Sequence, residues 1–203
     1  LVNYEEGRSE PLSQVNNPEC EEDGVRQVML SRELWIERSD FMEEPPRKFF
    51  RLGPDRYVRL RGGYIIKCVG FAKDSEGEVM EIRCEYLPGT IGQNAPEGVK
   101  CKAAIHWVSA EFGKAAKVRL YDRLFAVENP DAAEGGYESV LNPDSLEERE
   151  AWIEPVLEAM APEEVCQFER LGYFVADRYE HKQGESAVFN RTVVLRDSWA
   201  KKG

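Results

Sequence analysis

Short runs in which apolar and polar residues alternate dominate the chain, and a two-residue period is typical of strands with one buried face. The clearest run is 57–61, where Val58 and Leu60 alternate with Tyr57, Arg59 and Arg61. Turn-rich segments at 73–78 and 181–186 lie between apolar runs and predict two hairpin loops. The other predicted strands are 34–36, 64–72, 79–87, 102–108, 118–127, 166–168, 173–176 and 187–195.

Helical patterns are sparse. The best candidate is 145–160, where Ser145 followed by Glu147 and Glu148 resembles a helix N-terminus, although Pro155 would force a kink or a restart. A short turn at 39–44 is stopped by two prolines. Nine strands and little helix predict an all-β chain of barrels or sandwiches.

Changes of composition suggest two domains. A basic segment starts directly after Pro45 and Pro46, and a loop rich in Pro, Asp and Gly follows at 128–136. We therefore expect a middle domain at 47–126, inserted between 1–46 and 127–203, which would form the second domain together.

The net charge of −11 is unevenly distributed. Residues 1–45 carry 4 basic and 12 acidic side chains, and 126–165 carry 1 and 12, whereas 47–67 carry 7 and 1. Phosphate attraction is screened beyond about 10 Å, so a local basic strip suffices to bind RNA. The chain has no stretch of about 18 apolar residues, so no membrane span is predicted.

The basic strip has two interpretations, a solvated strand face or an RNA-binding surface. Its spacing favours RNA, because Arg59 and Arg61 would share the outer face roughly 7 Å apart, close enough to engage neighbouring phosphates or a base edge. Aromatic rings interleave with the cations and offer faces on which unstacked bases could lie. These rings belong to Phe49, Phe50, Tyr57 and Tyr64, and Lys48 adds a further cation.

Enzymatic motifs are absent from the sequence. It contains no phosphate-binding glycine loop, no nucleophile elbow, and five cysteines without a C-x-x-C pair. Of its two histidines, His106 fits a hydrogen-bonded structural role and His181 a solvated turn. The sequence alone therefore favours a binding module with no metal site over an enzyme.

Six short segments stand out along the chain: LWIERSDF (34–41), VRLR (58–61), IHWVS (105–109), RLYDRLF (119–125), QFER (167–170) and FNRTVVLRDSWAK (189–201). Together, in this order and over nearly the whole chain, they resemble the C-terminal anticodon-binding region of the glutaminyl-tRNA synthetase family. The resemblance implies two β-barrels, proximal and distal, that grip an anticodon loop. It also implies an upstream catalytic domain, whose histidine-rich and lysine-rich signature motifs do not occur here.

Residue roles follow by resemblance. Arg51 takes the position that reads the third anticodon base, a guanine, and Arg59 takes the position at the first base, with Arg61 on phosphate. Gln167, Glu169 and Arg170 match the pocket for the central uracil. This chain departs from the family at Phe50, where the family has Lys, and at Glu19, where it has Asn. A further arginine of the uracil pocket would lie upstream of Leu1.

The implied partners are the anticodon loop of glutamine tRNA and the parent enzyme's own N-terminal catalytic domain. ATP and Mg would bind in that domain, and no cofactor is expected in this chain. We expect a monomer that lies in the cytoplasm and does not associate with a membrane. The alternatives are the related domain of a eukaryotic-type glutamyl-tRNA synthetase, a ribosomal 5S-RNA-binding barrel and a protein-interaction module.

Overall fold

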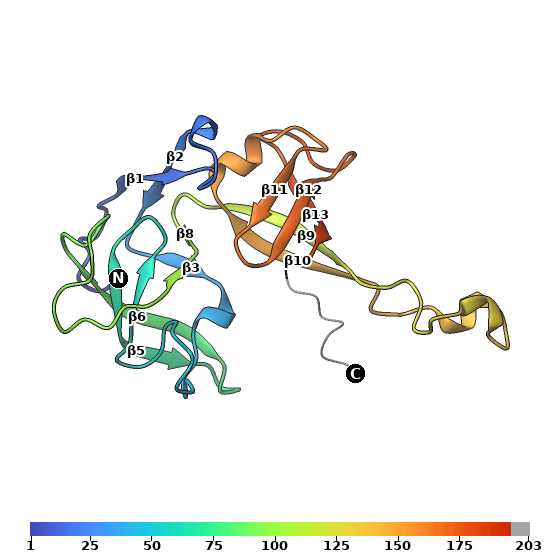
Figure 1. Ribbon diagram of the computed structural model, residues 1–203, viewed down its shortest axis with the longest axis horizontal. Coiled ribbons are helices and arrows are strands. Elements are labelled where there is room, and N and C mark those ends of the chain that lie inside the picture. The colour runs from blue at the N-terminus through green and yellow to red at the C-terminus, as the bar shows by residue number, and fades with distance from the viewer. Residues whose placement is uncertain (196–203) are drawn as a thin grey trace. The chain divides into compact units, whose positions relative to one another are not determined.

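The computed structural model describes residues 1–195 and is all-β, as expected. Its strands are connected by loops and by short 3₁₀ turns, η1 (Glu21–Asp23), η2 (Arg38–Asp40), η3 (Pro130–Ala132), η4 (Tyr137–Val140) and η5 (Pro155–Ala159) (Figure 1). The chain forms two compact units, Leu1–Gly113 and a second that begins at Lys114. No helix among the described residues is both long and apolar enough to cross a membrane.

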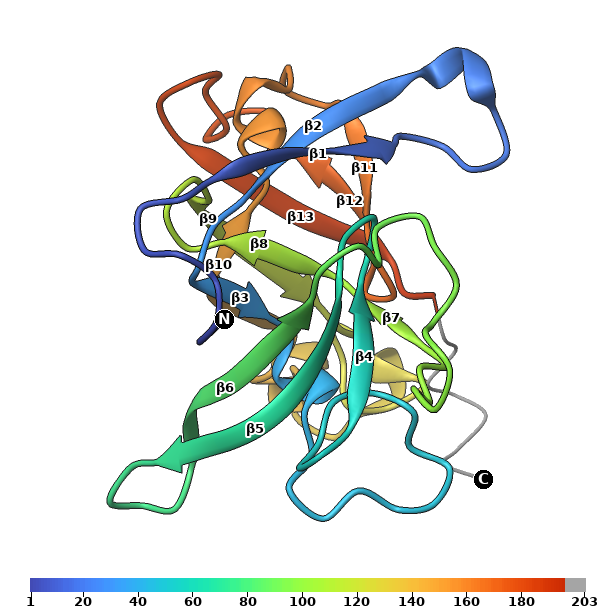
Figure 2. The same ribbon diagram turned by 90° about the vertical axis from the view of Figure 1, so that its left-hand side faces the viewer.

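The first unit contains three sheets. A hairpin pairs β1 (Glu10–Val15) with β2 (Val25–Leu30), and β3 (Leu34–Ile36) pairs with β8 (Trp107–Ser109). The third sheet has the order β6-β5-β4-β7 (Figure 2), with β4 antiparallel to β5 and parallel to β7. Its strands are β4 (Tyr57–Leu60), β5 (Ile65–Lys73), β6 (Val79–Leu87) and β7 (Ala104–Ile105).

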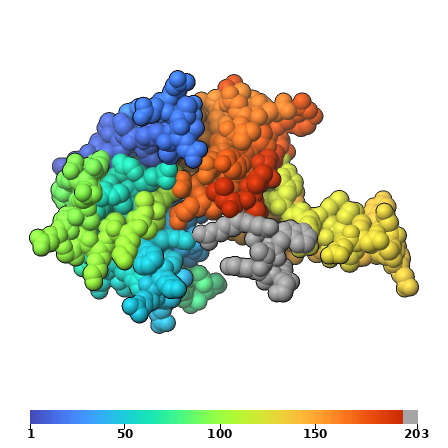
Figure 3. Space-filling model, viewed as in Figure 1, coloured from blue at the N-terminus to red at the C-terminus, as the bar shows by residue number. Residues whose placement is uncertain are grey.

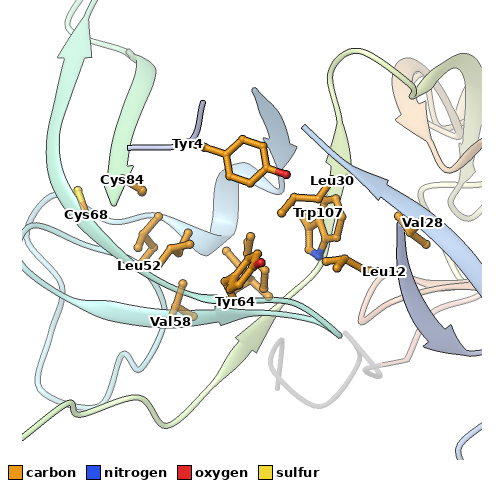
Figure 4. Close-up of a cluster of buried hydrophobic side chains, with 13 residues drawn as sticks. Tyr4, Leu12, Val28, Leu30, Leu52, Val58, Tyr64, Cys68, Cys84 and Trp107 are labelled. Carbon is orange, nitrogen blue, oxygen red and sulfur yellow. The ribbon is translucent and has the colours of Figure 1, made fainter. Parts of the chain in front are cut away.

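The core of the first unit draws side chains from both ends of its sequence (Figure 4). Trp107 is buried at its centre and donates its indole N–H to the Arg61 carbonyl at 3.0 Å. Tyr4 and Tyr64 donate their hydroxyls to one oxygen of Glu10 at 2.9 and 3.0 Å, which satisfies polar groups beside the core. Apolar contributions come from Leu12, Val28, Leu30, Leu52, Val58, Leu60, Ile66 and Ile105.

This core explains why the observed division differs from the expected one at 47–126. The acidic N-terminal segment supplies Leu12, Val28 and Leu30 to the same core as Leu52 and Val58. The change in composition at the two prolines therefore marks a loop within one unit. At the other boundary, the strand that we expected to close the middle domain joins the second unit's sheet.

The second unit is built on one five-stranded sheet of order β10-β9-β13-β12-β11. Phe174 and Phe189 lie on two of its strands and are buried, and Phe168 stacks on Phe174 with ring centroids 4.1 Å apart. The loop between its first two strands, 122–145, extends away from the sheet (yellow in Figure 3). Its strands are β9 (Lys114–Tyr121), β10 (Leu146–Ile153), β11 (Val165–Phe168), β12 (Gly172–Ala176) and β13 (Ala187–Val193).

The helix expected at 145–160 is wrong. Leu146–Ile153 forms β10 and pairs along its whole length with β9, and Pro155 starts the short turn η5. The local sequence favours a helix start, but the backbone of this segment forms hydrogen bonds with β9 instead and becomes the outer strand of the sheet. Tertiary pairing thus outweighs the local helix preference. The hairpin β1–β2 was also missed in the sequence, where Pro11 and the polar residues beside it dilute the alternation.

His181 does not lie in solvent as expected. It is buried, and its Nδ1 accepts the Val188 N–H at 3.2 Å, so Nε2 carries the proton and donates to the Met160 carbonyl at 3.0 Å. Its ring also meets Phe189 edge to face at 5.1 Å. His181 is therefore a structural residue that fixes the loop between β12 and β13.

Candidate nucleic-acid interface

The loop at 45–56, between η2 and β4, carries three of the predicted RNA-binding residues, Lys48, Phe49 and Arg51, together with Phe50. Lys48 is exposed, Phe49 and Arg51 are half-buried, and Phe50 is 49% exposed. Hydrogen bonds from the Met42 amide to the Leu52 carbonyl and from the Leu52 amide to the Asp40 carbonyl, 3.1 and 2.9 Å long, close the base of this loop. The basic and aromatic side chains of the loop therefore project from a segment whose two ends are hydrogen-bonded together.

Arg56 clamps this loop from within. Its Nη2 donates to the Pro45 carbonyl at 3.0 Å, and its Nη1 donates to the Phe49 carbonyl. Gly53 lies under the same turn, where an added Cβ would come within 2.9 Å of the Met42 carbonyl oxygen. Arg56 was not predicted as a functional residue, because nothing in the local sequence pattern distinguishes it from its basic neighbours.

Arg51 is held by one end of its guanidinium. Nη1 donates to the Ser39 carbonyl at 2.9 Å and to Oδ1 of the completely buried Asp40 at 3.2 Å. The guanidinium carbon lies 5.5 Å from the centre of the Phe49 ring. Within residues 1–195 the hydrogen bonds of the Arg51 side chain all leave from Nη1, so the edge formed by Nε and Nη2 can accept a ligand.

Strand β4 has the predicted alternation. Val58 and Leu60 are completely buried, while Tyr57 and Arg59 face outward and are half-buried. The Arg59 guanidinium binds the loop that follows β6, where Nη1 donates to the Thr90 carbonyl and Nη2 to the Gln93 carbonyl at 2.6 Å. Nη1 also donates to the Gly63 carbonyl in the turn between β4 and β5 at 3.3 Å. In this structure Arg59 therefore joins a strand to a loop.

The other predicted groups of the first unit differ in exposure. Arg61 lies one residue beyond β4 and is half-buried. Tyr64 is buried in the core, so the expectation that its ring offers a face to bases is wrong. Lys67 pairs with Asp55 at 3.1 Å, and this hydrogen bond raises the pKa of Lys67 above its ordinary value.

Lys102 joins this surface although the sequence analysis did not select it. Its Nζ lies 5.3 Å from the centre of the Phe50 ring, and the neighbouring Ala103 carbonyl accepts the Arg59 amide at 3.1 Å. The segment 102–104 thus touches both the loop at 45–56 and strand β4. A contact between residues so far apart in sequence leaves no local signal.

The predicted residues of the second unit lie on β11 and the turn after it. Gln167 is exposed and pairs with Tyr173 of β12, which in turn pairs with Val193 of β13, so the three face outward in a row. Phe168 packs inward, as predicted. Glu169 and Arg170 follow in a tight turn where Arg170 adopts a φ of 63°. Tyr173, 41% exposed, is an aromatic neighbour of Gln167 that the sequence analysis overlooked.

The described residues contain no group of three or more His, Cys, Asp and Glu side chains placed to hold a metal ion. Both surfaces carry guanidinium, amide and aromatic groups, and the first also carries ammonium groups. Such side chains bind phosphate oxygens and the edges and faces of unstacked bases.

Comparison with known proteins supports this reading. Two family models described as anticodon-binding domains of class I tRNA synthetases (E and Q) match residues 1–87 and 104–177. Proteins named glutamine–tRNA ligase from Bordetella pertussis, Nitrobacter hamburgensis and Neisseria meningitidis are 49%, 51% and 47% identical to the chain, covering 98%, 99% and 100% of it. The matches span 34%, 35% and 37% of those proteins, so the chain corresponds to about a third of their length. The chain belongs to the anticodon-binding domain family of the class I tRNA synthetases for glutamate and glutamine.

Proposed function

We propose that this chain is the anticodon-binding part of a glutamine–tRNA ligase and binds the anticodon loop of glutamine tRNA. The parent enzyme would join glutamine to that tRNA with ATP and Mg bound in a separate catalytic domain. The observation that carries the proposal is Arg51, whose guanidinium is tethered by Nη1 while Nε and Nη2 donate to no group within residues 1–195. We further propose a monomer, because each unit buries a hydrophobic core of its own within one chain. A cytoplasmic location is proposed from the likeness to glutamine–tRNA ligases.

The open edge of Arg51 suits a guanine. Nε and Nη2 are parallel donors, and guanine presents N7 and O6 as adjacent acceptors on one edge. Asp40 and the Ser39 carbonyl hold Nη1, which limits the rotation of the fork before RNA arrives. Arg51 would therefore read the third anticodon base, with Phe49 beneath its guanidinium.

Lys48, Arg61 and Lys102 supply charge along the same unit, and we assign them to phosphates. Phe50 stands where the family has Lys, and its exposed ring beside Lys102 offers a face for an unstacked base. Arg59 reaches the first anticodon base only if that base replaces the loop carbonyls that it binds.

Gln167, Glu169 and Arg170 would bind the central uracil. Uracil offers one N–H donor and two carbonyl acceptors on its edge, and an amide, a carboxylate and a guanidinium together can satisfy them. Gln167 is exposed on a strand whose other face is packed by Phe168. The ring of Tyr173 beside it gives the base a surface to stack on.

The decisive experiment is a titration of the chain with glutamine tRNA and with a twin altered at the third anticodon base, at two salt concentrations. We expect Arg51→Ala to weaken cognate binding and to reduce the preference for the cognate base by about 1–3 kcal/mol. Arg61→Ala should weaken both complexes equally and flatten the salt dependence. Arg83→Ala is the matched control, since Arg83 is an exposed arginine of the same unit that pairs with Glu81 on β6. Equal losses for both tRNAs in Arg51→Ala would refute base reading.

A glutamyl-tRNA synthetase domain is the second candidate, because the matching family models describe domains for both amino acids. The same titration separates the two, since discrimination between G and C at the third base distinguishes the corresponding tRNAs. A 5S-type ribosomal RNA binder would instead bind a structured RNA helix whatever the anticodon.

A further inference from the structure

Two cysteines face each other across the hairpin β5–β6. Cys68 and Cys84 are directly opposite in the strand register, and both are buried at one end of the core (Figure 4). Neither forms a disulfide in this structure. The hairpin therefore holds two adjacent thiols on neighbouring strands.

Backbone hydrogen bonds define the type of strand pair. The Cys68 amide donates to the Arg56 carbonyl at 3.1 Å, and the Cys68 carbonyl accepts the Asp55 amide at 3.2 Å. The Cys84 carbonyl accepts the Val2 amide at 2.8 Å on its other side. The polar backbone groups of the two cysteines thus point away from each other, which marks a non-hydrogen-bonded pair. Opposite Cα atoms in such a pair are about 4.5 Å apart, within the range of roughly 4.4–6.8 Å that a disulfide spans.

The thiols also interact with each other. The Cys68 thiol donates to the Gly70 carbonyl at 3.6 Å. Interaction with the neighbouring Cys84 and this hydrogen bond lower the pKa of Cys68, whereas interaction with Cys68 and burial raise the pKa of Cys84. Cys68 is therefore the thiol that ionises first, and the thiolate is the form that attacks a disulfide.

Access requires a local opening. Strand β6 is the last strand of its sheet, but on its outer side Val2 donates to the Cys84 carbonyl and Asn3 bonds the backbone of Tyr86. The β5–β6 ladder and these three hydrogen bonds therefore have to separate to expose both sulfurs. The hairpin ends in the exposed loop at 74–78, and edge hairpins open without global unfolding.

We propose that Cys68 and Cys84 form a redox modification site that a small-molecule disulfide converts to a cross-strand disulfide. The Cys68 thiolate attacks one sulfur of the oxidant, forming a mixed disulfide and releasing one thiolate. The Cys84 sulfur, after losing its proton to solvent, then attacks Cys68 and releases the second. Two protein thiols are oxidised and one oxidant disulfide is reduced to two thiols. This proposal stands whichever RNA the chain binds.

The link would act on the loop at 45–56. Cys68 is hydrogen-bonded through its backbone to Asp55 and Arg56, and Arg56 clamps the loop that carries Arg51. A disulfide would fasten β6 to the strand that holds this clamp and so oppose opening of the hairpin.

The test is to incubate the chain with excess oxidised glutathione under mildly alkaline conditions, then count thiols after denaturation and map the peptides by mass spectrometry. We expect two of the five thiols to be lost, together with the mass of two hydrogen atoms, and one linked peptide pair containing Cys68 and Cys84. The thermal midpoint should rise on oxidation and return on reduction. Cys166→Ala is the matched control and should oxidise like the unaltered chain.

Two results would overturn the proposal. One is glutathione adducts or links at other cysteines, with Cys68 and Cys84 still reduced. The other is formation of the linked pair only after the fold is lost, as judged by circular dichroism of parallel samples. Because both are measured on the unaltered chain, the test does not depend on whether a Cys68→Ala variant folds.

Discussion

Asp40 is completely buried and accepts a hydrogen bond from Nη1 of Arg51 at 3.2 Å. The Arg51 side chain itself remains 29% exposed, so the pair joins a buried anchor to a guanidinium at the surface. The anchor fixes one end of the guanidinium and orients the other. Asp40 is therefore a positioning residue for whatever Arg51 binds.

We expect Asp40→Asn to keep the fold and to reduce third-base discrimination by about 1 kcal/mol, because a neutral acceptor holds Arg51 less firmly. Asp55→Asn is the control, since Asp55 pairs with Lys67 on the surface of the same unit. Paired titrations with cognate and altered tRNA measure the effect. Equal discrimination in the Asp40 variant and the unaltered chain would contradict the positioning role.

Arg59→Ala should release the loop after β6, because its Thr90 and Gln93 carbonyls lose their charged donor. We expect faster amide hydrogen exchange at 88–93, unchanged exchange at 45–52, and a loss of stability on the order of 1–3 kcal/mol. Exchange followed by mass spectrometry reports both segments at once. A loss of first-base preference with no change in exchange would instead assign Arg59 to base contact.

Gly172→Ala should damage the second unit, because φ is +149° at this position and an added Cβ would lie 2.3 Å from the Val193 carbonyl oxygen. A loss on the order of 3 kcal/mol is expected in urea unfolding. Gly184→Ala is the control that measures the effect of backbone strain without a steric clash. Gly184 also has a positive φ but no atom near the added Cβ, so a loss of about 1 kcal/mol is expected there. Equal losses in the two variants would contradict the clash.

Asp177 makes the second unit sensitive to acid. Hydrogen bonds from Asn190 and from the amides of Glu180 and Tyr179, together with Arg119, hold the pKa of Asp177 below its ordinary value of 3.8. The stability that it contributes is complete above that value and is lost as pH falls through the folded pKa. Asp177→Asn should cost about 2 kcal/mol at neutral pH, and the deficit should shrink below about pH 4. Urea unfolding at both pH values measures it, and a deficit independent of pH would contradict the assignment.

Local alternation was enough to predict most strands, because a strand with one buried face has apolar and polar residues at alternate positions. Val58 and Leu60 of β4 show this plainly, whereas β5 was predicted from its nearly continuous apolar run. Strand β10 was predicted as a helix because its exposed acidic residues carry no strand period and only its pairing with β9 defines it.

The RNA-binding residues were chosen from charge, spacing and family resemblance, and their roles stay predictions. The sequence could not show which other residues hold these side chains in place. Asp40 and Arg56 act on Arg51 and its loop through tertiary contacts, and Lys102 reaches Phe50 from a distant segment. Tyr64 was wrongly placed on the aromatic surface. Its ring is buried in the core, where its hydroxyl donates a hydrogen bond to Glu10.

The shared core of the first unit sets a lower limit on how far this chain can be trimmed. A minimal peptide cut at 47–126 would keep the basic loop but discard Leu12, Val28 and Leu30, and so leave Leu52, Val58 and Trp107 facing water. Such a fragment would aggregate rather than bind RNA selectively. Any graft of this recognition loop onto another protein must therefore bring its acidic N-terminal neighbour with it.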